Sequence, residues 1–474
     1  MPSSTQPCTV AIAGGGLAGL AAGCALAEAG FRVSLFERRP YLGGRASSYQ
    51  HPGTGEVVDN CQHVLLGCCT NLLDFYRRAG VEDKIRWYEK LTFLEPGGRA
   101  SEIAPSSLPA PLHTAPAFLR AECLNFHDKV AISRAMAALA PSTPRDCGES
   151  FLDWLKSHGQ TPQAIERFWK TILVSALNED LDRVSVPYAA QVVRESFLKS
   201  AAAGRMGIPT VPLTDLYSTA GDYIRARGGE IQFRASLESF RMEGFQVSVT
   251  ANGQEDKFDY LVLALPFDAV GRILPDTTAA APLAAALEQF SSSPITGIHL
   301  WFDREISNLD HAVLLDRTIQ WMFHKSRLIA SRTEQARNPD SNDGGSYIEL
   351  VVSCSRSLVE KSKTEIVEMA MREAQEFFPH APDAVLLKST VIKEVHATYS
   401  PRPGIDQYRP KPQTAWPRVF LAGDWTATGW PATMEGAVRS GYLAAEAVAK
   451  FAGHKNVRFL VPDLAPSGLM RFFK

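Results

Sequence analysis

The sequence predicts an α/β fold in which a Rossmann-type dinucleotide-binding domain is assembled from both ends of the chain, with an α+β domain inserted between them. Three observations predict this fold. A glycine-rich strand–turn–helix pattern opens the chain, a strand ending in Gly423-Asp424 leads into a helix near the other end, and helices followed by strands lie between. One shared sheet is the economical explanation of two strand-to-helix junctions so far apart.

The first element, VAIAGGGLAG at Val10–Gly19, reads as a buried strand, a glycine turn and the start of a helix. Gly14 permits the tight turn, Gly16 lets backbone N–H groups approach a pyrophosphate, and Gly19 lets the helix pack closely on the strand. The helix N-terminus then turns its partial positive charge toward the phosphates. The pattern therefore predicts dinucleotide binding.

The second strand is expected over Phe31–Phe36, and Glu37 at its end can accept hydrogen bonds from a ribose. The uncharged run Thr9–Ala27 also has the length of a membrane-spanning helix. The glycines of the turn are poor helix formers, and no basic residue precedes the run, so a spanning helix or a signal peptide is disfavoured.

Composition places the chain among ordinary soluble proteins. Its 474 residues are enough for two or three domains, and a formal net charge of −2 gives no electrostatic case for binding nucleic acid. The eight cysteines show neither CxxC pairs nor zinc-finger spacing, so we expect reduced thiols, no metal site and a cytoplasmic location.

The middle of the chain is predicted to be helical and then strand-rich. Helices are expected over 71–80, 118–139, 150–157, 164–177, 187–199 and 364–378, and strands over 230–233, 240–250, 260–265, 295–302, 319–324 and 347–353. The last three strands alternate, which indicates a separate antiparallel sheet. Loops are expected over 105–116, 332–345 and the proline-rich 401–417.

Near the C-terminal end, Arg418–Asp424 reads as a strand and Thr433–Phe451 as a helix. We therefore expect a discontinuous dinucleotide-binding domain, a substrate-binding domain with a helical part and an antiparallel sheet, and a tail. The expected boundaries are 1–70, 210–280 and 390–452 for the first, 71–209 and 281–389 for the second, and 453–474 for the tail.

Together these motifs resemble the superfamily of amine oxidases, phytoene desaturases and protoporphyrinogen oxidases. That superfamily combines an N-terminal GxGxxG and acid, a downstream GGR, and a C-terminal AGD followed by a helix. The matching residues here are Gly14–Gly19, Glu37, Gly43-Gly44-Arg45, Ala422-Gly423-Asp424 and Thr433–Ala437. The resemblance covers nearly the whole chain and implies the flavoprotein fold of these enzymes.

The resemblance implies FAD as the cofactor. The pyrophosphate would be held by Gly14, Gly16, Leu17, Ala18 and Gly19, and the adenosine ribose by Glu37. Arg45 would lie beside the phosphates and flavin, Asp424 would accept from the ribityl or phosphate region, and the Met434 backbone N–H would meet the flavin pyrimidine edge, where a helix N-terminus stabilises negative charge. The further residues expected at the cofactor are Arg38, Gly44, Gln62, His63, Leu237 and Gly423.

A narrower resemblance rests on Asp59–Leu72, which is similar to a segment of the squalene-associated FAD-dependent desaturases, the hydroxysqualene dehydroxylases of bacterial hopanoid biosynthesis. Related flavoenzymes usually carry glycine where this chain has Cys61, a departure that matters only if the backbone there needs a positive φ. Other roles stay open for three residues: His63 as a core histidine, Arg45 as a surface cation and Asp424 as a turn cap.

The resemblance implies reduction of hydroxysqualene to squalene. The hydroxyl would need a general acid, which the sequence does not identify, and the allylic cation would need shelter from water. Two alternatives remain: a carotenoid-type desaturase that runs hydride transfer in the opposite direction, and a non-catalytic prenyl-binding escort. Intact FAD contacts favour an enzyme over the escort.

The implied substrate, a hydrophobic C30 isoprenoid, dissolves only in lipid. We therefore expect peripheral association with the inner face of the cell membrane through Phe118–Leu139 or the tail Phe459–Lys474, although both segments can equally pack on the protein's own core. The upstream hydroxysqualene-forming synthase is an expected partner.

Overall fold

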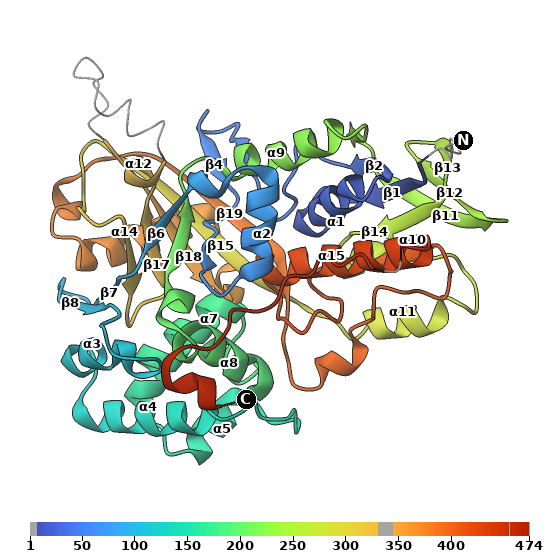
Figure 1. Cartoon of the computed structure of the whole chain (residues 1–474). Coiled ribbons are helices and arrows are strands. Elements are labelled where there is room, and N and C mark those ends of the chain that lie inside the picture. The colour runs from blue at the N-terminus through green and yellow to red at the C-terminus, as the bar shows by residue number, and fades with distance from the viewer. Residues whose placement is uncertain (1–6, 330–344, 455, 474) are drawn as a thin grey trace.

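A parallel sheet of five strands carries the N-terminal motif in the computed structural model, which describes residues 7–329, 345–454 and 456–473 (Figure 1). Its strand order is β10-β2-β1-β14-β20. The strands are β1 (Thr9–Ala13), β2 (Arg32–Glu37), β10 (Glu230–Phe233), β14 (Tyr260–Leu263) and β20 (Val419–Leu421). The sheet thus joins strands from both ends of the chain, as the sequence predicts.

Both faces of this sheet are buried because β1 alternates between two cores. Val10 and Ile12 pack with α1 (Leu17–Glu28), α9 (Leu213–Arg225) and α15 (Met434–Phe451). Ala11 and Ala13 pack on the opposite side with a meander of three strands. The meander strands are β11 (Leu237–Glu243), β12 (Gln246–Ala251) and β13 (Gln254–Phe258), and the nearby helices are α10 (Phe267–Ile273) and α11 (Ala281–Leu287).

A second sheet of seven strands has the order β19-β15-β18-β17-β16-β7-β8. Its pairs are antiparallel except for the parallel pair β16–β7. The strands are β7 (Leu91–Leu94), β8 (Ala100–Ile103), β15 (Ser292–Phe302), β16 (His311–Leu314), β17 (Trp321–His324), β18 (Ser346–Ser353) and β19 (Leu386–Tyr399). The predicted domain boundary at residue 390 falls inside β19.

One face of the seven-stranded sheet packs against α14 (Lys363–Phe377) through Ile298, Leu300, Ile348 and Leu350. The alternate residues of β15 and β18, which include His299 and Glu349, point to the other face. Every residue of β18 is buried. The alternation of these strands therefore marks two different buried environments, one apolar and one partly polar.

Most of the remaining helices lie in the lower left part of Figure 1. The helices are α2 (Thr70–Ala79), α3 (Ala115–Arg120), α4 (Phe126–Leu139), α5 (Phe151–Ser157), α6 (Pro162–Ala164), α7 (Thr171–Leu177), α8 (Val186–Val193) and α12 (Lys325–Leu328), with π-helical turns at Ile165–Lys170 and Arg194–Leu198.

Short strands and 3-10 turns complete the described chain. The strands are β3 (Ser48–Gln50), β4 (Val57–Asp59), β5 (Leu65–Leu66), β6 (Ile85–Tyr88) and β9 (Met206–Pro209). The 3-10 turns are Glu82–Lys84, Leu112–Thr114, Ala201–Gly204, Arg356–Leu358, Ala381–Asp383, Ile405–Tyr408 and Gly468–Phe472.

Two sequence predictions about these elements are wrong. The single helix expected over 118–139 is two helices, because Asn125 and Asp128 form a capping box that starts α4 after α3 has ended. The single strand expected over 240–250 is a hairpin, because the chain reverses at Gly244, whose φ is +59°. The sequence analysis also does not predict strands β3 to β9, β13, β16 and β19.

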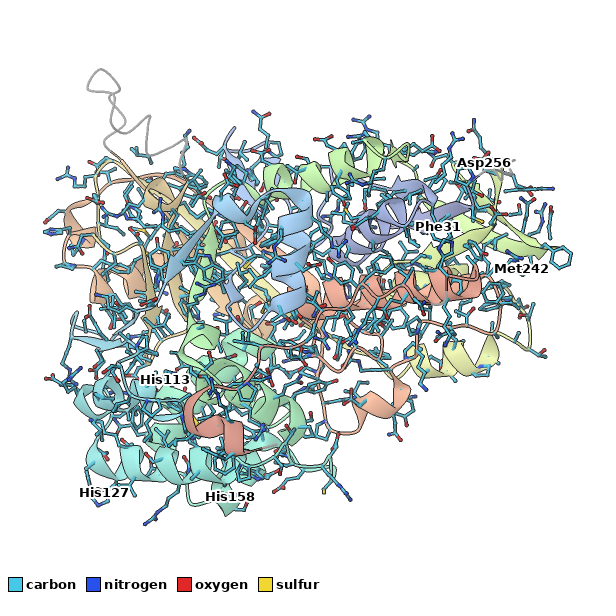
Figure 2. The ribbon with its side chains drawn as sticks, viewed as in Figure 1. Phe31, His113, His127, His158, Met242 and Asp256 are labelled. Atoms are coloured by element: carbon cyan, nitrogen blue, oxygen red, sulfur yellow. The ribbon has the colours of Figure 1, made fainter. Side chains whose placement is uncertain are left out.

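The molecule has two distinct ends. Figure 2 shows Met242 and Asp256 of the meander at one end of the molecule; His127 of α4 and His158, which directly follows α5, lie at the other. In the part of the chain that the structure describes, no helix is both long and apolar enough to cross a membrane. The expected loop at 332–345 lies outside the described residues except for Gly345.

Candidate active site

The N-terminal glycine turn requires glycine at two positions for steric reasons. Gly14 has a φ of +105°, and a Cβ there would lie 2.5 Å from the carbonyl oxygen of Ala264 on the neighbouring strand end. A Cβ on Gly19 would lie 1.9 Å from the Gly14 carbonyl oxygen. These contacts agree with the roles assigned to the first and third glycines, the turn and the close packing of α1.

Gly16 differs, because a Cβ there would meet only the Gly44 Cα, at 3.8 Å. Gly44 itself has a φ of +62° and approaches Gly16 so closely that its own Cβ would lie 2.9 Å from the Gly16 Cα. Leu17 and Ala18 then begin α1, whose N-cap residue offers no side-chain hydrogen bond. The result is a bare backbone cradle with unsatisfied helix N–H groups, the arrangement that binds a pyrophosphate.

Glu37 is buried at the edge of this cradle. Its Oε2 accepts from the Gly15 N–H at 2.7 Å, and its Oε1 accepts from the Arg39 N–H at 2.8 Å. Each carboxylate oxygen retains a lone pair for a ribose hydroxyl. Glu37 therefore holds the turn and keeps acceptor capacity on both of its carboxylate oxygens. Arg38 beside it is exposed, and Leu237 begins β11, just beyond the end of β10 that pairs with Glu37.

Arg45 joins the cradle to the far end of the chain. Its Nη2 donates to Asp424 Oδ1 at 2.6 Å, and its Nη1 donates to the Ala397 carbonyl at 2.9 Å. The Arg45 side chain is 37% exposed, whereas that of Asp424 is 6% exposed. Asp424 and burial act on the guanidinium in opposite directions, and the net effect is to raise the pKa of Arg45. The cation thus retains surface for a phosphate or flavin oxygen.

Gly423 and Met434 frame the loop that follows β20. Gly423 has a φ of +145°, and its N–H donates to Ser440 Oγ at 2.8 Å. Met434 is the first residue of α15, which Thr433 caps through the Gly436 N–H. Helices α1 and α15 cross in close contact, since a Cβ on Gly441 would lie 2.2 Å from the Ala18 carbonyl oxygen.

The segment Asn60–His63 runs from Arg45 toward the seven-stranded sheet. Asn60 Nδ2 donates to the Arg45 carbonyl at 2.7 Å. His63 donates from Nδ1 to the Cys61 carbonyl at 2.8 Å, which leaves Nε2 as an acceptor, and burial lowers the pKa of His63. Cys61 does not have a positive φ, so its replacement of a glycine causes no backbone strain.

Lys325 and Glu349 are functional candidates that the sequence analysis missed. Lys325 is buried and donates from Nζ to Asp59 Oδ2 at 2.6 Å and to Gln62 Oε1 at 2.7 Å; Glu349 Oε2 lies 3.5 Å from the same nitrogen. A lone acid in the otherwise apolar strand Tyr347–Ser353 was the available signal for Glu349. Lys325 follows a predicted strand and carried no such signal.

Arg409, also missed, holds the loop between β20 and α15. Its buried guanidinium donates from Nη2 to the Asp424 carbonyl at 3.0 Å, to Thr428 Oγ1 at 3.0 Å and to the Trp430 carbonyl at 2.8 Å. Its Nη1 group donates to the Tyr188 hydroxyl and to Asp406 Oδ1. These contacts fix the backbone that carries Asp424.

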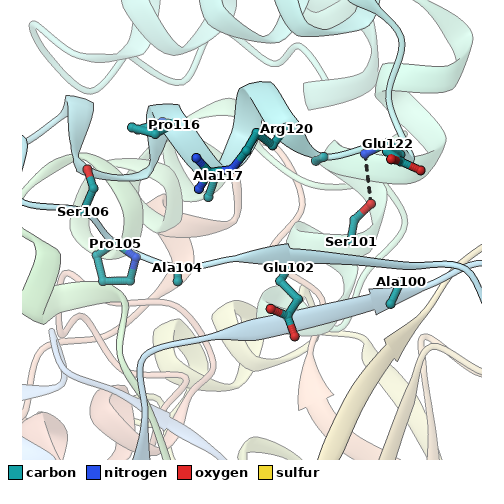
Figure 3. A pocket seen from close by; sticks show the side chains of 11 residues that line it. Ala100, Ser101, Glu102, Ala104, Pro105, Ser106, Pro116, Ala117, Arg120 and Glu122 are labelled. Carbon is teal, nitrogen blue, oxygen red and sulfur yellow. Dashed lines mark hydrogen bonds between the residues drawn. The ribbon is translucent and has the colours of Figure 1, made fainter.

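Two surface pockets are candidate binding sites for a substrate. One of about 520 Å³ between α10 and the ends of β15 and β19 is lined by Phe267, Phe290, Val395 and His396, whose neighbour Ala397 contacts Arg45. The other, of about 320 Å³, lies between β8 and α3, where Glu102, Arg120 and Glu122 make it polar (Figure 3). The second is unsuited to a long apolar molecule.

The structure therefore brings most of the predicted residues into one continuous strip. The backbone of four glycines, Gly14, Gly16, Gly19 and Gly44, forms the cradle. Glu37 lies at one edge of it, bound to the Gly15 N–H, and the Arg45–Asp424 ion pair lies beside Gly44. Gln62 extends the strip to Lys325 through a hydrogen bond. An anion-binding cradle with an acid for a ribose suits FAD, which has a pyrophosphate and an adenosine ribose.

Comparison with known proteins gives the same assignment. The model of the family described as flavin containing amine oxidoreductase matches residues 17–449. The chain is 28% identical to the 15-cis-phytoene desaturase of Synechococcus elongatus over 93% of this chain and 95% of that one, and 25% identical to its probable zeta-carotene desaturase over 93% and 98%.

The fold is also that of solved oxidoreductase structures. An oxidoreductase from Methanosarcina mazei superposes with a TM-score of 0.69 at 18% identity over 93% of this chain and 99% of that one, and the cyclohexylamine oxidase of Brevibacterium oxydans with a TM-score of 0.65 at 16% identity over 95% and 100%. The family match, with the cradle that fits FAD, shows that this chain is an FAD-dependent oxidoreductase that belongs to the family of flavin containing amine oxidoreductases.

Proposed function

We propose that the protein reduces hydroxysqualene to squalene in squalene and hopanoid biosynthesis. Reduced FAD supplies the hydride for such a reaction. The chain's own residues have the remaining tasks: they bind the C30 chain, protonate the departing hydroxyl and exclude water from the allylic cation. The cofactor contacts assigned to the predicted residues are part of this proposal.

The observation that carries the proposal is a polar cluster within apolar surroundings. Gln62, Lys325 and Asp59 are linked by hydrogen bonds on the site-facing side of the seven-stranded sheet. Around them is a compact apolar cluster formed by Cys61, Met206, Ile208, Phe323, Leu328 and Val351. A pure hydrocarbon offers these polar groups no hydrogen bond, whereas an isoprenoid alcohol offers one hydroxyl and an apolar chain.

A second candidate is desaturation of a carotenoid-type substrate. The relatives at 25–28% identity over most of both chains are named as phytoene and zeta-carotene desaturases, which supports this alternative. The same flavin site serves either direction of hydride transfer. What differs is the substrate, because an allylic alcohol that loses water becomes a good hydride acceptor.

Anaerobic single-turnover experiments distinguish the two candidates. Photoreduced protein mixed with hydroxysqualene should reoxidise without oxygen and yield one squalene per flavin. If the flavin stays reduced, and oxidised protein instead bleaches on addition of phytoene or squalene, the desaturase assignment replaces ours. Protein purified without any flavin would support the non-catalytic escort.

We also propose that the protein receives its substrate at a membrane surface or from the hydroxysqualene-forming synthase. Hydroxysqualene partitions into lipid, so a freely dissolved supply is negligible. Exposed apolar side chains on the helical end of the molecule support a surface location, and liposome binding tests it as described in the Discussion.

A further inference from the structure

Glu349 occupies an unusual position for an acid. It lies in the middle of β18, is fully buried, and faces His299 directly across the antiparallel pair β15–β18. Gly297, two residues before His299 on the same face of β15, has no side chain; a Cβ there would lie 3.6 Å from Glu349 Oε1 and 3.5 Å from His299 Nε2. The absence of a side chain at Gly297 leaves room for a methyl-sized group beside the Glu349 carboxyl group.

The charges around Glu349 do not balance if every group is ionised. Lys325, Asp59 and Glu349 form a buried triad. Lys325 is its one cation, and Asp59 and Glu349 are two carboxyl groups. A buried net negative charge is costly, so one carboxyl group should hold a proton at neutral pH. The hydrogen bonds indicate which one.

Asp59 is the carboxyl group that is ionised. Its oxygens accept from Lys325 at 2.6 Å, from Ser48 Oγ at 2.5 Å and from the Leu213 N–H at 3.3 Å, and these contacts hold the pKa of Asp59 below its usual range. Glu349 lies farther from Lys325, at 3.5 Å, and its other hydrogen-bonding neighbour is the Gln62 backbone, so its carboxylate is the less stabilised of the two. Burial, aided by Asp59 and opposed by Lys325, raises the pKa of Glu349 to about 7.

The triad adjoins the cofactor site through one short segment. Asn60 binds the Arg45 carbonyl, Gln62 accepts from Lys325, and a Cβ on Gly297 would lie 3.4 Å from the Asn60 carbonyl oxygen. The carboxyl group of Glu349 is therefore on the side of the sheet that faces Arg45 and its neighbours, rather than on the side covered by α14.

We propose that Glu349 is the proton donor that protonates the allylic hydroxyl of the substrate, with Asp59 and Lys325 setting its protonation state. This inference rests on the proposed function. The Glu349 proton moves to the hydroxyl oxygen, the C–O bond breaks with its electron pair to release water, and the carbon accepts a hydride from the two-electron reduced flavin. Glu349 is left as a carboxylate beside Lys325 and regains a proton from water.

Three variants test the proposal. E349Q removes the proton donor but preserves its shape. D59N keeps Glu349 but removes the negative charge that raises its pKa, so Lys325 then favours the Glu349 carboxylate. E373Q is the matched control, because Glu373 is a buried glutamate on α14, on the opposite side of the same sheet, where it accepts from the Thr318 and Ile319 N–H groups.

Infrared difference spectroscopy of the holoenzyme gives a readout that does not depend on turnover. Wild type should show a protonated-carboxyl C=O band that disappears as the pH rises through about 7. The band should be absent in E349Q, should disappear at lower pH in D59N and should be unchanged in E373Q. An unchanged band in E349Q, or no such band in wild type, overturns the proposal.

Single-turnover kinetics with hydroxysqualene tests the proton transfer itself. The rate of flavin reoxidation in wild type should fall as the pH rises through about 7, and E349Q should lower it by about 100-fold or more, the range for loss of a general acid, with little change in substrate affinity. D59N should move the falling limb to lower pH. A purely structural role predicts a loss that does not depend on pH, which would count against the proposal.

Failure of the proposed function has a different signature. If wild type does not reoxidise with hydroxysqualene although the E349Q-sensitive band titrates, the reaction assignment is wrong and the hydroxyl-protonating role of Glu349 falls with it. If wild type forms squalene and E349Q is as fast across the pH range, the reaction assignment stands and Glu349 is not the donor.

Discussion

Arg45 donates a hydrogen bond to Asp424 at 2.6 Å, although 379 positions separate the two residues in the chain. This contact joins the GGR segment after the first strands to the Gly-Asp end of β20. Because the Arg45 side chain is partly exposed, the ion pair contributes only modestly to stability. Its more important effect is positional, since it holds one guanidinium at the junction of the two chain ends.

Replacement of Gly16 should block cofactor binding without unfolding the protein. A Cβ at Gly16 would lie no closer to another residue than 3.8 Å, from the Gly44 Cα, so we expect G16V to fold, but the valine fills the space expected for the pyrophosphate. Flavin content by absorbance should fall to background. G271V, at an uncrowded helical glycine of α10, is the control and should retain flavin. Normal flavin in folded G16V would refute this role.

Glu37 should have two measurable roles. E37A removes the ribose acceptor and should weaken FAD binding by roughly 1.5–3 kcal/mol, about 10- to 150-fold in Kd. It also leaves the Gly15 and Arg39 N–H groups without their acceptor, so the apoprotein should melt at a lower temperature. Titration of apoprotein with FAD and thermal melting measure the two effects. Unchanged FAD affinity would make Glu37 purely structural.

The flavin should be bound without a covalent link. All eight cysteines are free, and the sequence shows no attachment motif at a cysteine or histidine. Acid precipitation should therefore release all yellow colour into the supernatant. Colour that stays in the pellet after denaturation would contradict the prediction.

Glu349 should make the stability of the protein depend on pH between about 4.5 and 7. Its pKa is about 7 in the folded protein and near the ordinary 4.5 when unfolded, so its contribution is fully present below pH 4.5 and is lost as the pH rises through 7. The loss is on the order of 3 kcal/mol. Urea unfolding should show wild type losing stability over this range relative to E349Q; parallel curves for the two proteins would contradict the raised pKa.

Membrane binding should depend on the helical end of the molecule. Phe126 is 73% exposed and Phe472 is 82% exposed, whereas Phe459 and Met470 of the tail are buried, so the tail both packs on the protein and presents apolar surface. With basic neighbours such as Lys129 and Arg471, these side chains suit an anionic bilayer. Wild type should float with anionic liposomes, and F126S/F472S should float several-fold less.

The control for flotation is F245S. Phe245 is 83% exposed but lies in the turn between β11 and β12 of the meander, whose residues Met242 and Asp256 mark the other end of the molecule in Figure 2. It should float like wild type. No flotation of wild type would favour delivery of the substrate by a partner protein.

Local patterns in the sequence determined the dinucleotide-binding domain of this protein. The glycines near Gly16, the acid Glu37 and the strand before Asp424 act through backbone sterics and strand order, which short segments encode. The same local reasoning failed where a weak signal was overlooked, as at the capping box of Asn125 and the reversal at Gly244.

Only the tertiary structure decided the polar half of the site. Asp59, Lys325 and Glu349 come from three segments separated by up to 290 positions, and Lys325 comes close to Glu349 because α12 follows β17, the strand that pairs with β18. The charge state of Glu349 depends on burial and on the field of both neighbours, and neither is a local property of the sequence. Sequence therefore determined which cofactor the protein takes, and long-range packing determined which ionisable side chains lie together beyond Arg45.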